Sequence, residues 1–190
     1  RDRVYQLNQD KVFAAIRPAA QEKSGGLFIV ADGMGGHQAG EVASDLAVQT
    51  IRQELSWFLD SSDPADTQPS MPRTDKTTVV DGSIDLPLLR RLRRAIEQAN
   101  QSIATYSQDN PNDAGNMGTT VTCALVDEET AIIANVGDSR TYLLRDNELR
   151  QVTEDHSYVA QLVREGQLAP KDVFSHPRRN VITLSLIHIS

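Results

Sequence analysis

Residues 32–36, Asp-Gly-Met-Gly-Gly, are the first place in this sequence where residue types and spacing could do chemistry. They follow the apolar run 27–31, so an acidic side chain stands at the end of a predicted strand. Asp32 offers a hard carboxylate oxygen, and Gly33 can turn its own carbonyl oxygen toward the same ion because it has no Cβ. A loop without large side chains also admits a phosphate. The segment therefore indicates a Mg²⁺ or Mn²⁺ site beside a space for a phosphate group.

Two common phosphate-binding loops do not match this segment. A P-loop requires Gly-Lys-Ser/Thr, and no lysine lies in residues 32–37. A dinucleotide-binding fingerprint that starts at Gly33 requires glycine at position 38, where Gln38 stands. A glycine-rich turn kept only for tight packing is the structural alternative, and the loop alone leaves it open.

Three further polar segments could contribute to the same site, although each alone is typical of ordinary structure. Residues 8–10, Asn-Gln-Asp, are typical of a turn. Residues 135–140, Asn-Val-Gly-Asp-Ser-Arg, are typical of a turn between strands, and residues 153–157, Thr-Glu-Asp-His-Ser, of a helix cap.

Composition excludes several classes of protein. The 190 residues carry 19 Lys and Arg against 26 Asp and Glu, a net charge of −7, which argues against nucleic acid as a partner. No apolar run approaches the roughly 18 residues of a membrane-spanning helix. The single cysteine, Cys123, excludes an internal disulfide and a cysteine zinc site, and it favours the reducing cytoplasm. Because the sequence opens on Arg1 without a Met, we expect an internal start.

The elements that must position these residues follow from hydrophobic periodicity. Residues 27–31 predict a strand that is covered on both faces, leading into a tight loop at 32–36. Apolar residues repeat every three or four positions in two stretches, which predicts two amphipathic helices. The helices are expected from about residue 41, with Ala43, Ala47, Ile51, Leu55 and Phe58 inside, and over 86–107, with Leu88, Leu92, Ala95, Ile96, Ala99, Ile103 and Tyr106 inside.

The remaining pattern alternates loops and short strands. We predict a flexible insertion loop over 60–85, a second loop over 109–118, and a helix from an Asp155 cap to residue 165 that ends at Gly166. Strands are predicted at 12–15, 119–126, 131–136 and 141–144, with 148–152 pairing back across Asp146-Asn147. Segregated runs of strands and helices indicate an α+β fold in layers.

Taken together in order, these motifs resemble the bacterial metal-dependent Ser/Thr protein phosphatases of the PPM, or type 2C, family. The matching segments are residues 8–10, 32–37, 118–120 (Gly-Thr-Thr), 137–140 (Gly-Asp-Ser-Arg), 153–157 and 176–183. The resemblance implies two packed antiparallel β-sheets flanked by helices, an αββα sandwich. It also implies a partial phosphatase domain over residues 1–183, incomplete at its C-terminus.

The resemblance assigns a role to each matching acid. Asp32 is the catalytic residue that bridges two Mn²⁺ or Mg²⁺ ions, and Gly33 offers its carbonyl to one of them. Asp10 holds metal-bound waters, and Asp138 helps to bind a weaker third ion. In such two-metal centres a water activated between the ions attacks phosphorus in line, so no nucleophilic side chain is required. The implied substrates are phosphorylated proteins, with a Ser/Thr kinase as counterpart.

Three departures from the family pattern affect these roles. The arginine that clamps substrate phosphate in many members is replaced by Tyr5, which leaves Arg3 as the candidate substrate-binding residue. The histidine that follows Asp-Gly in eukaryotic relatives is Met34 here, and His37 lies nearby. Two further metal-binding aspartates of the family would follow Thr183, after the last residues given.

Residues 184–190, Leu-Ser-Leu-Ile-His-Ile-Ser, resemble a translated sequencing adaptor, and we expect them to be a non-native tail. We therefore expect the 190 residues alone to show weak turnover or none. The alternative function is an inactive pseudophosphatase, a regulatory module that binds phosphoproteins without hydrolysing them.

Overall fold

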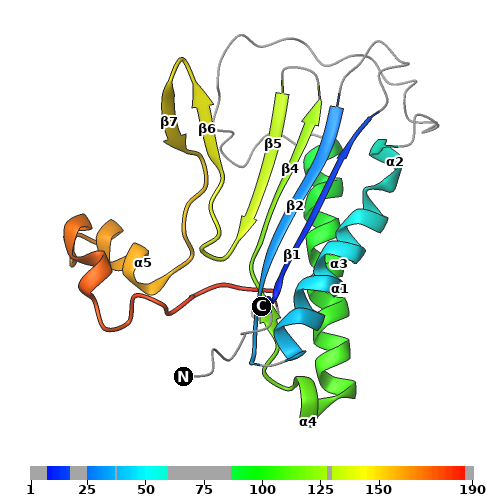
Figure 1. Cartoon of the computed structure of the whole chain (residues 1–190), viewed down its shortest axis with the longest axis horizontal. Coiled ribbons are helices and arrows are strands. Elements are labelled where there is room, and N and C mark those ends of the chain that lie inside the picture. The colour runs from blue at the N-terminus through cyan, green and yellow to red at the C-terminus, as the bar shows by residue number, and fades with distance from the viewer. Residues whose placement is uncertain (1–7, 18–24, 37, 60–86, 128–129, 187–190) are drawn as a thin grey trace, which may run out of the picture.

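A single antiparallel sheet forms the centre of the molecule in the computed structural model, which describes residues 8–17, 25–36, 38–59, 87–127 and 130–186. Its strand order is β1-β2-β4-β5, and β3 pairs with the end of β2 (Figure 1). The strands are β1 (Asp10–Ile16), β2 (Gly25–Met34), β3 (Gly118–Thr119), β4 (Val121–Asp127) and β5 (Thr130–Val136).

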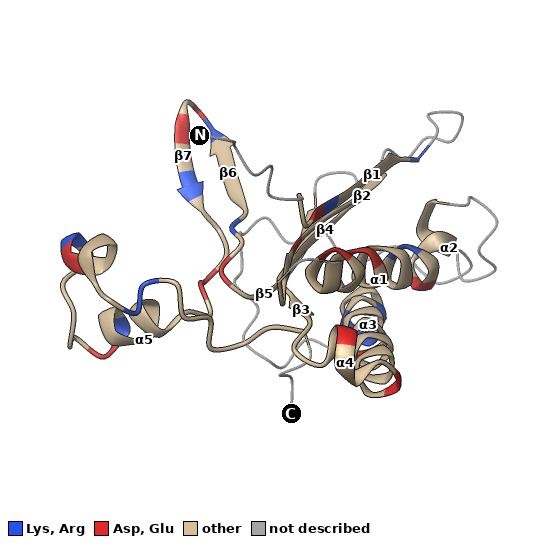
Figure 2. Cartoon of the chain, turned by 60° about the horizontal axis from the view of Figure 1, so that its bottom comes forward, with Lys and Arg blue, Asp and Glu red and all other residues tan. Residues whose placement is uncertain are grey.

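Two long helices cover one face of this sheet. They are α1 (Gln38–Glu54), which continues after a break at Leu55 into α2 (Ser56–Leu59), and α3 (Pro87–Asp109). Figure 2 shows the sheet close to edge-on with both long helices on the same side. Both predicted apolar stripes lie in the core, except that Tyr106 is 38% exposed at the end of its stripe.

The expectation that the central strand is covered on both faces is wrong. Burial alternates along β2: Leu27 and Ile29 are fully buried against the helices, whereas Phe28 and Val30 are 38% and 42% exposed. Both faces of this strand are apolar in sequence, so the run shows no alternation of apolar and polar residues. Periodicity therefore does not show that only one of the two faces is packed.

The predicted loop at 32–36 is also partly wrong, because β2 continues through Met34. Gly33 pairs with Thr119 and Met34 with Gly118, so cross-strand pairing to β3 keeps the glycine-rich residues extended. The turn begins only at Gly35 and Gly36, whose φ angles of 129° and 75° require glycine.

A smaller unit lies beside the sheet, on the side away from α1 and α3 (Figures 1 and 2). It contains the hairpin β6 (Tyr142–Arg145) and β7 (Glu148–Gln151), the helix α5 (Tyr158–Arg164) and a 3-10 helix (Pro170–Ser175). The hairpin confirms the predicted turn, since Asp146 and Asn147 both take positive φ. The N-cap of α5 is Ser157, which accepts from the Ala160 N–H; the predicted cap, Asp155, is engaged elsewhere.

Two other expectations change in detail. The predicted loop at 109–118 contains a short helix, α4 (Pro111–Ala114), with proline in its first turn. The single strand predicted at 119–126 is divided at Thr120, which hydrogen-bonds to the backbone of Asp32. The insertion at 60–85 lies outside the described residues.

The antiparallel sheets with their flanking helices form the α+β sandwich that the sequence predicted. Leu186, within the segment expected to be a non-native tail, is fully buried and donates its N–H to the carbonyl of Thr119 over 3.0 Å. Among the described helices, none combines the length and apolar character needed to cross a membrane.

Candidate metal centre

Two aspartates face each other across neighbouring strands at one end of the sheet. Asp10 begins β1 and Asp32 lies near the end of β2, and the antiparallel register pairs them directly. Since alternate residues share a face, both carboxylates lie on the sheet face that the helices leave open. Like charges placed directly opposite are destabilising, so this pair favours a bound cation.

The electrostatics of Asp32 agree with this geometry. Partial removal of water raises the pKa of the Asp32 carboxyl, and the adjacent Asp10 raises it further through its charge and a hydrogen bond. The charge of Asp138 adds to the rise in this pKa. The three acids are therefore near enough to interact, and a divalent cation would relieve their repulsion.

Gly33 fixes the distance between this strand and helix α1. A Cβ at Gly33 would lie only 2.0 Å from the carbonyl oxygen of Gly40, so no larger residue can occupy the position. The Gly33 N–H donates to the Gln9 carbonyl over 3.2 Å, and the Ser44 hydroxyl donates to the same oxygen over 2.6 Å. Gln9, which precedes Asp10, and Gly33, which follows Asp32, are thus held against α1.

Asp138 reaches the same sheet end from a turn that follows β5. The preceding Gly137 has φ 109°, and a Cβ there would lie 2.6 Å from the Thr120 side chain. Thr120 and Ser139 share a hydroxyl hydrogen bond of 2.7 Å, and the Thr120 hydroxyl also accepts from the Asp32 N–H over 3.2 Å. Thr120 therefore links the segments that carry Asp32 and Asp138.

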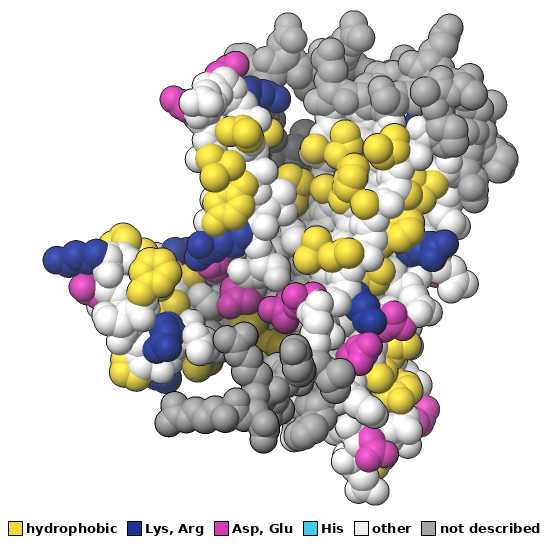
Figure 3. Space-filling view, in the orientation of Figure 1, with side chains coloured by type: hydrophobic (Ala, Val, Ile, Leu, Met, Phe, Trp, Pro, Cys, Tyr) yellow, Lys and Arg dark blue, Asp and Glu magenta, His cyan; other side chains and the backbone are white. Residues whose placement is uncertain are grey.

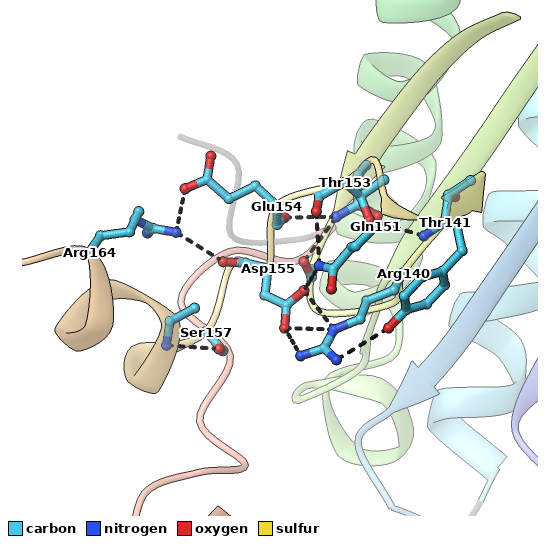
Figure 4. A network of polar contacts seen from close by, with 12 residues as sticks. Arg140, Thr141, Gln151, Thr153, Glu154, Asp155, Ser157 and Arg164 are labelled. Atoms are coloured by element: carbon cyan, nitrogen blue, oxygen red, sulfur yellow. Dashed lines mark hydrogen bonds and ion pairs between the residues drawn. The ribbon is translucent and has the colours of Figure 1, made fainter. Parts of the chain in front are cut away.

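A second polar network fixes the far side of this turn (Figure 4). Arg140 donates to both carboxylate oxygens of Asp155 over 2.6–3.0 Å, and Gln151 also donates to Asp155. The hydrogen bonds of Arg140 to Asp155 and Tyr142 raise the pKa of its guanidinium above the ordinary value. Asp155, which the sequence predicted to be a helix cap, therefore holds the turn that carries Asp138 by charge-assisted hydrogen bonds.

The residues present suit a hard divalent cation. Mg²⁺ needs one or two carboxylates and keeps several waters, and Asp10, Asp32 and the Gly33 carbonyl supply donors of that kind. Within the described part of the chain, however, no three His, Cys, Asp or Glu side chains stand close enough to hold an ion by themselves. Figure 3 shows acidic side chains gathered below the apolar face of the sheet.

Of the predicted site residues, the fold brings Asp10, Asp32, Gly33 and Asp138 to one end of the sheet. Arg3 and His37 lie outside the described residues. Sequence reasoning assigned no role to Thr120, Ser139 or His156, although all three stand inside the quoted motifs. The sequence feature that could have identified them is that small hydroxyl residues and a histidine repeatedly occur beside the acids.

Comparison with known proteins identifies the family of this chain. A model of the protein phosphatase 2C family matches residues 2–185. The serine/threonine phosphatase stp of Listeria welshimeri is 37% identical over 174 residues, covering 87% of this chain and 60% of that protein. The serine/threonine protein phosphatase PstP of Mycobacterium tuberculosis is 36% identical over 179 residues, covering 94% of this chain and 28% of that protein.

Solved structures give the same result. The S. agalactiae serine/threonine phosphatase superposes with a TM-score of 0.72 at 31% identity, over 96% of this chain and 64% of that one. The catalytic domain of PstP in complex with two manganese ions gives 0.63 at 31% identity, over 95% and 68%. The chain thus spans less than two thirds of the length of these two curated relatives. Since the family model covers nearly all of its residues, the chain belongs to the protein phosphatase 2C family.

Proposed function

We propose that the protein containing this chain removes phosphate from phosphoserine and phosphothreonine in proteins, using divalent metal ions. The observation that carries the proposal is the direct pairing of Asp10 with Asp32 on the open face of the sheet. Relatives at 36–37% identity are serine/threonine phosphatases, which supports the substrate class.

Asp10, Asp32, Gly33 and Asp138 would hold the ions, with Asp32 shared between two of them. Bound divalent ions would supply Lewis acidity, which lowers the pKa of water and offsets charge on phosphoryl oxygens. The manganese-bound relative favours Mn²⁺, although the same oxygen donors also suit Mg²⁺. A third, weaker ion at Asp138 and a cytoplasmic location stay predictions from the sequence.

The residues of this chain would contribute by where they are placed: they would bind the ions, leave space for the phosphate and bind it. The Asp32 side chain must be ionised to bind cations. Its raised pKa disfavours the ionised form in the metal-free protein, and a bound cation would offset this effect. Gly35 and Gly36 themselves carry no side chains that would exclude a phosphate. Arg3 is the proposed phosphate ligand, and Arg3→Ala should raise KM more than it lowers kcat.

We also propose that residues 1–190 alone bind the ions weakly, since their described acids form no cluster of three. Turnover of a phosphopeptide with Mn²⁺ should then be low for this chain and high for the full-length protein. Equal activity of the two would contradict this incompleteness. A full-length protein that binds phosphopeptide without hydrolysing it would favour the pseudophosphatase instead.

The deciding experiment is Asp32→Asn in the full-length protein. Because a neutral amide bridges cations poorly, kcat/KM should fall by at least about a hundredfold, as when a main electrostatic contributor is lost. Asp113→Asn is the matched control, because Asp113 is an exposed aspartate in α4. Near-normal turnover of Asp32→Asn would mean that the metal centre is misassigned.

A further inference from the structure

The turn that carries Asp138 is held by four hydrogen bonds, three of which join it to the segment 154–156, and we call this set the Gly137 clasp. The Gly137 N–H donates to His156 Nδ1 over 3.1 Å, and the His156 N–H donates back to the Gly137 carbonyl over 2.9 Å. The Asn135 side-chain amide donates to the carbonyls of Gly137 and Glu154, over 3.2 and 3.1 Å. The residue next to Asp138 is thus bonded at both its N–H and its carbonyl.

The side chain of His156 is essential to this arrangement. Any residue at 156 supplies a backbone N–H, but only an acceptor at the position of Nδ1 can receive the Gly137 N–H. Without that acceptor, a backbone donor in a partly enclosed turn loses its partner. No function has been assigned above to this histidine, which is half-buried.

Rotation of the turn would move Asp138 directly. The other side of the turn rests on the buried Thr120, whose hydroxyl joins Ser139 to the Asp32 backbone. The clasp and Thr120 therefore hold the turn from two directions, and the position of Asp138 relative to Asp32 depends on both. Small displacements of a metal ligand are costly, because supporting hydrogen bonds set ligand orientation.

We propose that His156 is a positioning residue, which sets the place of Asp138 through the Gly137 clasp. The inference rests on the proposed function, since it takes Asp138 as a metal ligand. His156 itself touches neither substrate nor ion in this role. It acts through the backbone of Gly137.

The test uses the full-length protein labelled with ¹⁵N, with Mn²⁺ as the probe. Two quantities are measured: hydrogen exchange of the Gly137 amide, and paramagnetic broadening of the Asp138 and Asp32 amides during Mn²⁺ titration. In His156→Ala the Gly137 amide should exchange about tenfold faster, the effect of losing one hydrogen bond. Broadening at Asp138 should weaken relative to broadening at Asp32.

Matched variants separate positioning from general damage. His156→Asn keeps an acceptor two bonds from Cβ and should restore both values, whereas His156→Gln places its acceptor one bond farther and should not. His176→Ala is the control, because His176 Nδ1 also accepts a backbone N–H, from Arg178 over 3.1 Å, without contacting the Asp138 turn. If His156→Ala does not fold, the contrast between Asn and Gln decides.

The outcomes distinguish this inference from the proposed function. Wild-type exchange and broadening in His156→Ala or His156→Gln would overturn the inference, as would equal changes in His176→Ala. If the wild-type full-length protein shows no Mn²⁺ broadening at Asp32 or Asp138, the metal centre itself is wrong and the inference falls with it. Faster exchange with unchanged broadening would mean that the clasp does not position Asp138, which also overturns it.

Discussion

At the scale of single residues, Asp32 combines two opposing demands. The fold places its carboxylate opposite Asp10 and partly removes it from water, and both effects raise its pKa. A group whose folded pKa is raised stabilises the fold below its ordinary pKa of 3.8, and that stability is lost as pH rises through the folded value. In the metal-free protein, ionised Asp32 should therefore lower the free energy of unfolding at neutral pH.

Asp32→Asn should raise the free energy of unfolding at pH 7 by up to about 1 kcal/mol in the presence of a chelator, since it removes a like-charge contact. The gain should shrink as pH falls, because the wild-type carboxyl becomes protonated. Urea unfolding at several pH values measures it, with Asp113→Asn as the control. Added Mn²⁺ should stabilise the wild type and not Asp32→Asn; a gain that is independent of pH would contradict this account.

Cys123 is a titratable group that burial keeps protonated and therefore unreactive in the folded protein. It lies in β4 with 1% of its surface exposed, and burial raises the pKa of its thiol to about 12. Because the thiolate is the reactive form, the native protein should resist thiol reagents at pH 8 and react fully in denaturant. Rapid labelling of the native protein would show that β4 opens readily.

At the scale of elements, the approach of α1 to β2 decides where the acids lie. Gly33 and Gly40 bring the two backbones together, and a Cβ at Gly40 would meet both Gln9 and Gly33 at under 3.0 Å. The helix therefore starts against the strand end that carries Asp32. Sequence periodicity predicts both elements, but it does not show that two glycines join them.

Gly33→Ala should lower the free energy of unfolding by about 3 kcal/mol or more, since its Cβ would collide with backbone and cannot be accommodated by a rotamer change. Gly36→Ala is the matched control, in the turn that follows the same strand. Nothing lies within 4 Å of a Cβ at Gly36, so its cost should be only about 1–2 kcal/mol, that of its positive φ. Denaturant midpoints measure both, and equal losses would contradict the contact.

At the scale of the whole molecule, the sheet presents an apolar face opposite the helices. Val12 and Ile16 of β1 are 72% and 73% exposed, and they share this face with Phe28 and Val30 of β2. Figure 3 shows the hydrophobic side chains gathered over the strands. These neighbouring side chains form a continuous apolar surface, unlike single exposed apolar residues, and this surface should bind apolar probes.

The double change Val12→Thr and Val30→Thr should lower the fluorescence of bound ANS while leaving stability within about 0.5 kcal/mol, because Val12 is 72% exposed and Val30 42% exposed. Val152→Thr, at an exposed position beside the separate hairpin, is the control and should leave ANS binding unchanged. ANS titration measures the change. Undiminished fluorescence in the double variant would place the apolar probe site elsewhere.

The sequence by itself determined the elements and the types of residue in the site. Helical stripes such as Leu92 to Ile103 are encoded by spacing. An acid followed by glycines fits a cation site, but the loop alone also fits a turn kept for tight packing. Asp10 and Asp138 were assigned to the site through the family resemblance that the ordered motifs carry, because each of their segments alone is typical of a turn.

Only the tertiary structure decided which of these residues meet. The pairing of Asp10 with Asp32 depends on the register of β1 and β2, and the exposure of Val30 depends on which face the helices cover. The bond from Gly137 to His156 joins residues 19 positions apart. Register and long-range hydrogen bonds arise from packing between elements that are far apart in sequence. Local periodicity depends only on neighbouring residues, so it does not predict that packing.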